Sequence, residues 1–185
     1  GRPFSPTVAA QLLADSGYTG APTITLMVNT SDKHLAVARE VREIWYETLG
    51  ISVTIKHMPW SQYSDLMRNG SASERPGVWR LGWGSDYPDG ENNLALFYGP
   101  NQSPGSNHYN YENAEYDALY RKIRSMQPSP ERTAIYCKMR DMLIEDVPYI
   151  GSLARTNYYL VHPRVRNCKP TEVFGNWWKY LDVED

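Results

Sequence analysis

The stretch RLGWGSDYPD, residues 80–89, decides how the rest of the chain is interpreted. It continues an apolar strand that begins at Val78, breaks at a glycine and places Asp86 on a loop between two aromatic residues. In α/β proteins, a strand end that runs into a glycine-containing loop is where ligand-binding groups are found. A carboxylate there, with Trp83 and Tyr87 limiting its hydration, suits a cationic partner such as an ammonium group. The alternative is an ordinary strand–loop corner, in which a solvated aspartate lies beside two structural aromatics.

Length and composition restrict the class of protein. The chain has 185 residues, of which 22% are charged, and a net charge of −2. It is long enough to bury a core as one domain or as one lobe of a larger protein. Its weak net charge gives no general attraction for nucleic acid or for an acidic membrane. Fourteen Tyr and six Trp against three Phe suit clefts and interfaces, or equally an exported protein with many half-buried aromatics. No apolar run approaches the roughly 20 residues that cross a bilayer.

Two strands joined by a long helix precede the opening stretch. Residues 6–17 have the apolar spacing of a short helix that ends at a glycine, and residues 23–29 alternate and then run apolar, as a strand does. Apolar residues recur at helical spacing over residues 32–49, and residues 51–55 alternate as a second strand. This order predicts a parallel pair of strands with a right-handed crossover.

Short elements surround the stretch itself. A helix that opens at Pro59 leads to a third strand over residues 78–83, and a short helix is expected over residues 92–98. Residues 99–107 are rich in Gly, Pro, Asn and Ser, which is typical of a surface loop.

Two capped helices and an aromatic segment complete the chain. Asn113 and Ser129 stand at N-cap positions before apolar residues with helical spacing. Residues 149–161 are aromatic and β-prone, and Pro163 ends this segment. The sequence as a whole predicts an α/β fold with a mostly parallel sheet flanked by helices.

The order of these segments resembles the solute-binding proteins of peptide and nickel ABC importers. Residues 82–89, GWGSDYPD, are similar to the Gly-Trp-x-x-Asp-Tyr-x-x-Pro region of that family. Four other segments resemble family motifs in the same order and bring the resemblance to nearly the whole chain: 12–18 (their LLAEAGY), 113–119 (NPEYDAL), 134–150 (LY…ILIEDAPII) and 156–161 (NYYLV).

The resemblance implies one lobe of a two-lobed periplasmic-binding-protein fold of type II. Residues 1–162 match the C-terminal, ligand-binding lobe, and the bulk of the first lobe is absent. Residues 163–185 depart from the family's ending and are expected to form an irregular tail, which in the whole protein would return towards the missing first lobe.

The resemblance also assigns roles within the stretch. In peptide-binding members, the aspartate of the motif holds the free α-ammonium of the peptide, and the matching residue is Asp86. Trp83 matches the tryptophan of the cleft wall, and Arg80 matches an arginine that lines the same pocket. Tyr87 is expected to shape the pocket with them. The ligand backbone is expected to approach closely at the two small residues between, Gly84 and Ser85.

The implied function is capture without chemistry. Such a protein binds oligopeptides or dipeptides outside the cytoplasmic membrane and delivers them to the permease of an ABC importer. It would be periplasmic or extracellular, and any membrane anchor would belong to the missing N-terminal part. It would need no cofactor and would bind no nucleic acid. The same scaffold carrying an oligosaccharide or another non-peptide solute is one alternative, since a fold does not fix a substrate. A hydrolase or metal-dependent enzyme is another.

Histidine and cysteine give little support to the enzyme alternative. The four histidines have no metal-binding spacing, and no Gly-x-Ser-x-Gly motif is present to activate a serine. Cys137 and Cys168 are too few to define a disulfide scaffold. The expected lengths of the helix and the returning strand would let these two meet in one disulfide, and two free buried thiols are the alternative.

Overall fold

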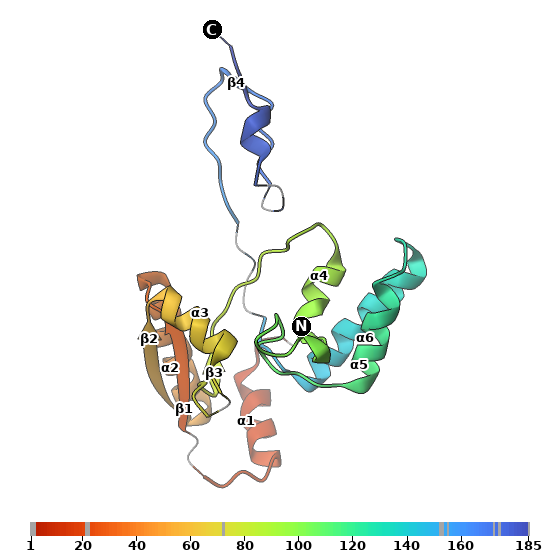
Figure 1. Cartoon of the computed structure of the whole chain (residues 1–185). Coiled ribbons are helices and arrows are strands. Elements are labelled where there is room, and N and C mark those ends of the chain that lie inside the picture. The colour runs from red at the N-terminus through yellow and green to blue at the C-terminus, as the bar shows by residue number, and fades with distance from the viewer. Residues whose placement is uncertain are drawn as a thin grey trace. The chain divides into compact units, whose positions relative to one another are not determined.

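A computed structural model describes residues 3–20, 23–71, 73–151, 154, 156–171, 173 and 175–184 (Figure 1). The chain divides into two compact units. Unit 1 comprises Gly1–Gly82 and Ser103–His108, and unit 2 comprises Trp83–Gln102 and Tyr109–Asp185. The chain therefore passes from unit 1 to unit 2 inside the stretch of residues 80–89.

Unit 1 is built on a three-stranded parallel sheet. β1 is the central strand and pairs in parallel with both neighbours. Its pairing with β2 runs along the whole of both strands. The α/β class and the parallel pair predicted from the sequence are confirmed. In the order of the sheet, the strands are β2 (Ser52–Met58), β1 (Thr23–Asn29) and β3 (Val78–Trp79), and the helices of this unit are α1 (Pro6–Asp15), α2 (Asp32–Leu49) and α3 (Trp60–Asn69).

Neighbouring residues of β1 pack against different helices, which lie on opposite sides of the sheet (Figure 1). Leu26 and Val28 are buried with Ala38 of α2. Met27, between them, is buried with Tyr63 of α3. Because side chains alternate across a strand, a strand covered on both faces needs a continuous apolar run. The end of β1 has that run.

The third strand is shorter than the sequence predicts. It was expected over residues 78–83, but β3 comprises only Val78 and Trp79, which pair with Leu26 and Met27. Continued in this register, β1 ends opposite residue 81 and offers no partner for residues 82 and 83. The two glycines of the stretch also weaken a strand. The chain therefore leaves the sheet before the predicted site.

Unit 2 is mainly helical. The short helix expected over residues 92–98 starts two residues earlier, because Asp89 caps it by accepting from the backbone N–H of Glu91. The predicted caps Asn113 and Ser129 are confirmed, since each side chain accepts from backbone N–H groups of the following turn. The elements are α4 (Gly90–Leu94), two 3₁₀ helices η1 (Ala95–Phe97) and η2 (Gly99–Asn101), α5 (Ala114–Ile123) and α6 (Pro130–Asp146).

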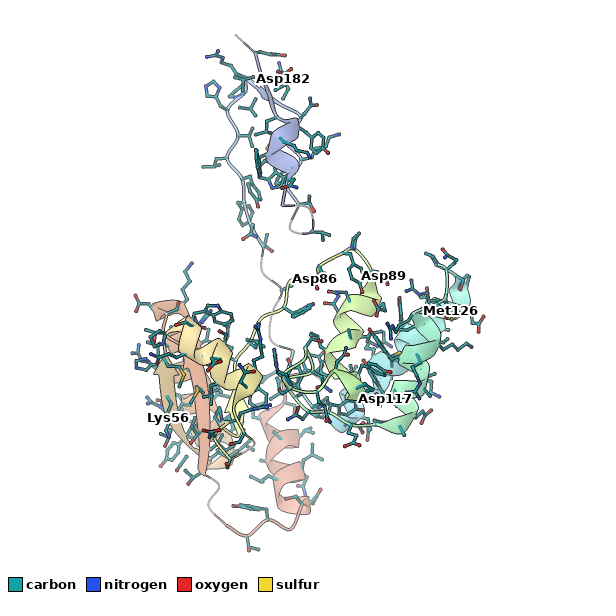
Figure 2. The ribbon with its side chains drawn as sticks, viewed as in Figure 1. Lys56, Asp86, Asp89, Asp117, Met126 and Asp182 are labelled. Carbon is teal, nitrogen blue, oxygen red and sulfur yellow. The ribbon has the colours of Figure 1, made fainter. Side chains whose placement is uncertain are left out.

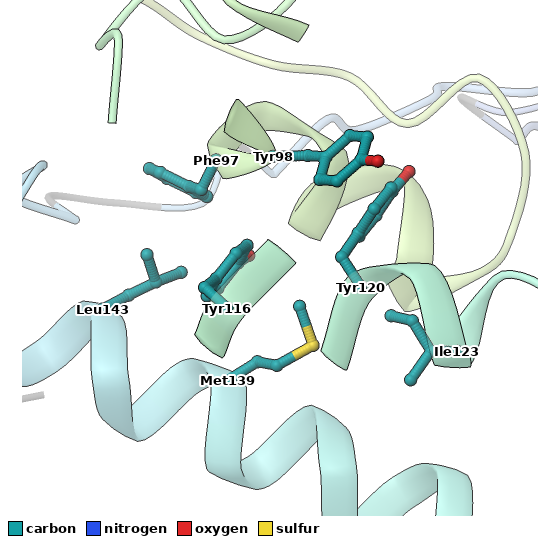
Figure 3. Close-up of a cluster of buried hydrophobic side chains, with 7 residues drawn as sticks. All are labelled: Phe97, Tyr98, Tyr116, Tyr120, Ile123, Met139 and Leu143. Carbon is teal, nitrogen blue, oxygen red and sulfur yellow. The ribbon is translucent and has the colours of Figure 1, made fainter. Parts of the chain in front are cut away.

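The core of unit 2 lies between η1, α5 and α6 (Figure 3). Tyr116, Tyr120 and Ile123 recur at helical spacing on α5 and are all buried. Tyr109 stacks on Phe97, with 5.0 Å between the ring centroids, so this tyrosine beside the polar loop packs against the core. This core packs α5 against α6, and these are the two helices that hold α4.

The aromatic segment near the C-terminus forms no strand in its described residues. A strand was expected over residues 149–161, but residues 149–151, 154 and 156–161 have no strand pairing. Tyr158 is 90% exposed and Leu160 is fully exposed. A β-prone sequence forms a strand only where a neighbour can exchange hydrogen bonds with it, and no neighbour pairs with these residues.

The last residues contain regular structure that the prediction of an irregular tail missed. β4 (Val165–Arg166) pairs antiparallel with β5 (Asp182–Val183). A 3₁₀ helix, η3 (Trp177–Tyr180), lies between them in the sequence. Side chains reinforce the pair, since Arg166 and Glu184 form a salt bridge at 2.7 Å. The division at residue 162 into a lobe and a tail that returns to a first lobe stays a prediction.

Candidate ligand-binding site

The six predicted site residues are divided between the two units. Arg80 belongs to unit 1. Its backbone N–H donates to the carbonyl of Met27 at 3.1 Å, and its own carbonyl accepts from the hydroxyl of Tyr63 at 2.7 Å. The role of Arg80 in a pocket stays a prediction. The other five, which form a local site in unit 2, are Trp83, Gly84, Ser85, Asp86 and Tyr87.

One buried asparagine on α4 organises this loop. Asn92 is 6% exposed. Its Oδ1 accepts from the indole Nε1–H of Trp83 at 3.0 Å and from the backbone N–H of Asp86 at 3.1 Å. Its Nδ2 donates to Oδ2 of Asp86 at 3.2 Å. The same amide thus binds both the aromatic wall and the acidic residue of the predicted site.

Two further side chains of α4 hold the rest of the loop. Asn93 Nδ2 donates to the hydroxyl oxygen of Ser85 at 3.2 Å. Glu91 accepts hydrogen bonds from the hydroxyls of both Tyr87 and Tyr120. The bond to the Glu91 carboxylate raises the pKa of Tyr87 above its usual value. Tyr87 is therefore a neutral hydrogen-bond donor whose ring is held against α4.

Asp89 joins the start of α4 to α6. Its carboxylate accepts from the hydroxyl of Tyr136 at 2.6 Å and forms a salt bridge with Arg132 at 2.7 Å. The Arg132 side chain is 9% exposed, so this ion pair is largely removed from water. Burial acts to raise the pKa of Asp89, but hydrogen bonds from the Glu91 backbone, Tyr136 and Arg132 outweigh it and lower the pKa.

The structure contradicts the expected desolvation of Asp86. Asp86 is exposed, on the extended loop that precedes α4 (Figure 2). Trp83 is 42% and Tyr87 43% exposed, and their polar atoms bind Asn92 and Glu91 of α4. The two aromatics therefore leave the carboxylate open to water within this chain. Gly84 is open as well, since no heavy atom beyond its two neighbours in the chain lies within 4 Å of the position that a Cβ would occupy.

Sequence reasoning missed the residues that support the loop. Asp89 could have been found as an N-cap, because it directly precedes Gly90 and Glu91 at the start of a helix. Asn92 occupies the third helical position, from which a side chain reaches back past the cap. The ion pair with Arg132 spans 43 residues, and no local pattern indicates such a contact.

Two hollows in the described part of the chain do not include the loop. A hollow of about 500 Å³ borders β1 and β3 in unit 1, and another of about 540 Å³ lies in the C-terminal tail. None of the six predicted site residues lines either hollow. Within the described ranges, no three His, Cys, Asp or Glu side chains are grouped to hold a metal ion. None of the helices in these ranges is both long and apolar enough to cross a membrane.

The two cysteines are free thiols in the structure. Cys137 is exposed on α6, and Cys168 is half-buried. The disulfide that the sequence allowed is not formed here, and the alternative of two buried thiols is also wrong for Cys137.

Comparison with known proteins gives consistent matches. Residues 1–105 match the family described as bacterial extracellular solute-binding proteins, family 5 Middle. The chain is 29% identical over 159 residues to the periplasmic oligopeptide-binding protein OppA of Escherichia coli. The matched region covers 85% of this chain and 28% of that protein. The chain thus spans little more than a quarter of the length of this relative.

Solved structures agree with the fold. A periplasmic oligopeptide-binding protein of Borrelia burgdorferi, OppAIV, has a TM-score of 0.70 at 33% identity, over 78% of this chain and 29% of that one. Haemophilus influenzae OppA in complex with RPPGFSPFR has a TM-score of 0.77 over 96% of this chain and 34% of that one, and at 23% identity it supports the fold alone. These neighbours have the periplasmic binding fold of type II.

Proposed function

This chain belongs to family 5 of the bacterial extracellular solute-binding proteins, and we propose that it is the C-terminal lobe of a two-lobed protein that captures peptides for an ABC importer. Two of the relatives matched over most of its length, OppA of Escherichia coli and OppAIV of Borrelia burgdorferi, are named as oligopeptide-binding proteins. Their chains are more than twice as long, which leaves room for the first lobe. Like its relatives, the protein would work in the periplasm or outside the cell.

The observation that carries this proposal is the contrast between the two aspartates of the loop. Asp89 is neutralised by Arg132 and takes part in holding α4. Among the residues that the structure describes, Asp86 forms no ion pair, and its carboxylate accepts a hydrogen bond only from Asn92, at Oδ2. A carboxylate that is fixed in place but has no cation of its own suits the α-ammonium of a peptide. Asp86, and not Asp89, is therefore assigned to the ligand.

The neighbours of Asp86 suit a peptide main chain. Trp83 and Tyr87 present exposed aromatic surface, which a bound ligand can cover. The open space at Gly84 admits the ligand backbone close to the protein backbone. In the two-lobed protein, closure of the first lobe over this loop would remove Asp86 from water and strengthen its interaction with an ammonium. Arg80 keeps its predicted role toward the ligand, and delivery would be to a membrane permease.

The proposal is tested by the chemistry of the peptide terminus. The two-lobed protein that contains this chain is titrated by calorimetry with a tripeptide and with the same tripeptide acetylated at its amino group. Acetylation removes the charge that pairs with Asp86, so binding should weaken by roughly 30-fold or more. Equal affinity for both forms would contradict ammonium recognition. Amidation of the carboxyl terminus, which leaves the ammonium intact, serves as the matched control.

A further inference from the structure

The loop carries two groups that face a ligand, and a single side chain holds both. Trp83 donates its indole N–H to Asn92, and Asp86 both donates its backbone N–H to Asn92 and accepts from it. No other bond from these two residues to a side chain is found in the part of the chain that the structure describes. The relative placement of the aromatic wall and the carboxylate therefore depends on one amide.

We propose that Asn92 is a positioning residue for ligand capture, which sets the distance and orientation between the Trp83 ring and the Asp86 carboxylate. This inference rests on the proposed function, because it concerns the same site. Asn92 does not contact the ligand in this account. It acts through the two residues that do.

Only a side-chain amide satisfies all three bonds. The indole N–H and the backbone N–H are donors, so both must face Oδ1, which has two lone pairs. Nδ2 is thereby directed at the carboxylate of Asp86, which only accepts. An aspartate at this position would keep the two bonds to the N–H groups but would place a second carboxylate against that of Asp86. A leucine of similar volume would lose all three bonds.

Two residues that precede Asn92 at the start of α4 are themselves held by the rest of unit 2. Asp89 caps the helix and is bound to α6 through Arg132 and Tyr136. Glu91 is held by the hydroxyls of two tyrosines, one of them Tyr120 in the core of the unit. The amide therefore projects from a helical turn that is anchored to the helical core of unit 2. This rigidity is what a positioning residue requires.

The test combines three variants with two measurements. Hydrogen exchange of the Trp83 indole N–H and of the Asp86 amide is followed by NMR in the two-lobed protein, for Asn92→Leu, Asn92→Asp and the control Asn93→Ala. Asn93 lies on the same turn, but within the described part of the chain its side chain forms hydrogen bonds with the Ser85 hydroxyl and with neither Trp83 nor Asp86. Tripeptide affinity is measured for wild type and Asn92→Leu in the two-lobed protein.

We expect Asn92→Leu to accelerate exchange of both protons by about fivefold or more, and to weaken tripeptide binding by about tenfold. Asn92→Asp should retain the protection, because its carboxylate still accepts both N–H bonds, and Asn93→Ala should leave both protons as in wild type. Unchanged exchange in Asn92→Leu would overturn the proposal. So would acceleration that is uniform over the chain, which marks a residue that only stabilises the fold.

Failure of the proposed function gives a different result. The wild-type two-lobed protein could bind no tripeptide while Asn92→Leu still accelerates the exchange of these two protons and no others. In that case Asn92 orients the loop and the ligand has been assigned wrongly. If the tripeptide binds and Asn92→Leu binds it equally well, capture is supported and the positioning role of Asn92 is rejected.

Discussion

Replacing Asp86 with alanine should weaken tripeptide binding of the two-lobed protein by roughly 30-fold or more, because truncating one partner of a buried charge pair costs ~2–5 kcal/mol. The charge becomes buried only on lobe closure, since Asp86 is exposed in this chain. The stability of the unliganded protein should therefore change little. Calorimetric titration measures the affinity, and urea denaturation checks the fold.

A second titration makes this result specific to the ammonium. In the Asp86→Ala protein, the free and the N-acetylated tripeptide should bind with similar affinity, because the group that discriminates between them is gone. Asp65→Ala is the matched control. Asp65 is an exposed aspartate on α3 that accepts a hydrogen bond from Asn69, and its removal should leave both affinities unchanged. Wild-type affinity in Asp86→Ala would remove this residue from the role.

Replacing Asp89 with alanine should lower the free energy of unfolding by about 3 kcal/mol. The change leaves the guanidinium of Arg132, which is 9% exposed, without its carboxylate, and losing one partner of a largely buried pair is strongly destabilising. It also removes the N-cap of α4, which is worth about 1 kcal/mol. Urea denaturation followed by circular dichroism measures the loss. Removal of an exposed pair, by Glu115→Ala opposite Lys138, should cost less than about 1 kcal/mol.

The pH dependence separates the charge of Asp89 from its shape. The pKa of Asp89 is lower in the folded protein than in the unfolded chain, where it is about 3.9. Its ionised form therefore stabilises the fold fully above about pH 5, and this contribution is lost as the pH falls through the folded pKa. Asp89→Asn should be less stable than wild type at neutral pH, and the difference should shrink below about pH 4. A difference that stays constant down to pH 3 would show that the ion pair contributes nothing.

Much of unit 1 could be predicted from the sequence, because its elements are specified by local patterns. The apolar run at the end of β1 serves two helices, and Gly50 ends α2 in the left-handed conformation that glycine adopts without strain. The caps of α5 and α6 were recognisable for the same reason. Periodicity and capping depend on residues close in sequence, so a single sequence displays them directly.

The parts that could not be predicted depend on partners distant in the sequence. The length of β3 is set by where β1 ends, and the segment around Tyr158 forms no strand because none of the described strands pairs with it. At the site, the binding role of the loop residues stays a prediction, and the side chains that support the loop were not predicted. Asp89 meets Arg132 across 43 residues, and Asn92 reaches back six residues to Asp86 at a spacing that belongs to no regular element.

The central claim, that the protein captures peptides, is tested most directly by the solute that it carries. The two-lobed protein is purified from cells under native conditions, without refolding, and the small molecules released on denaturation are identified by mass spectrometry. A set of short peptides with free amino termini is the predicted result. Release of an oligosaccharide or another solute without an ammonium group, and of no peptide, would contradict the account and leave Asp86 without its proposed partner.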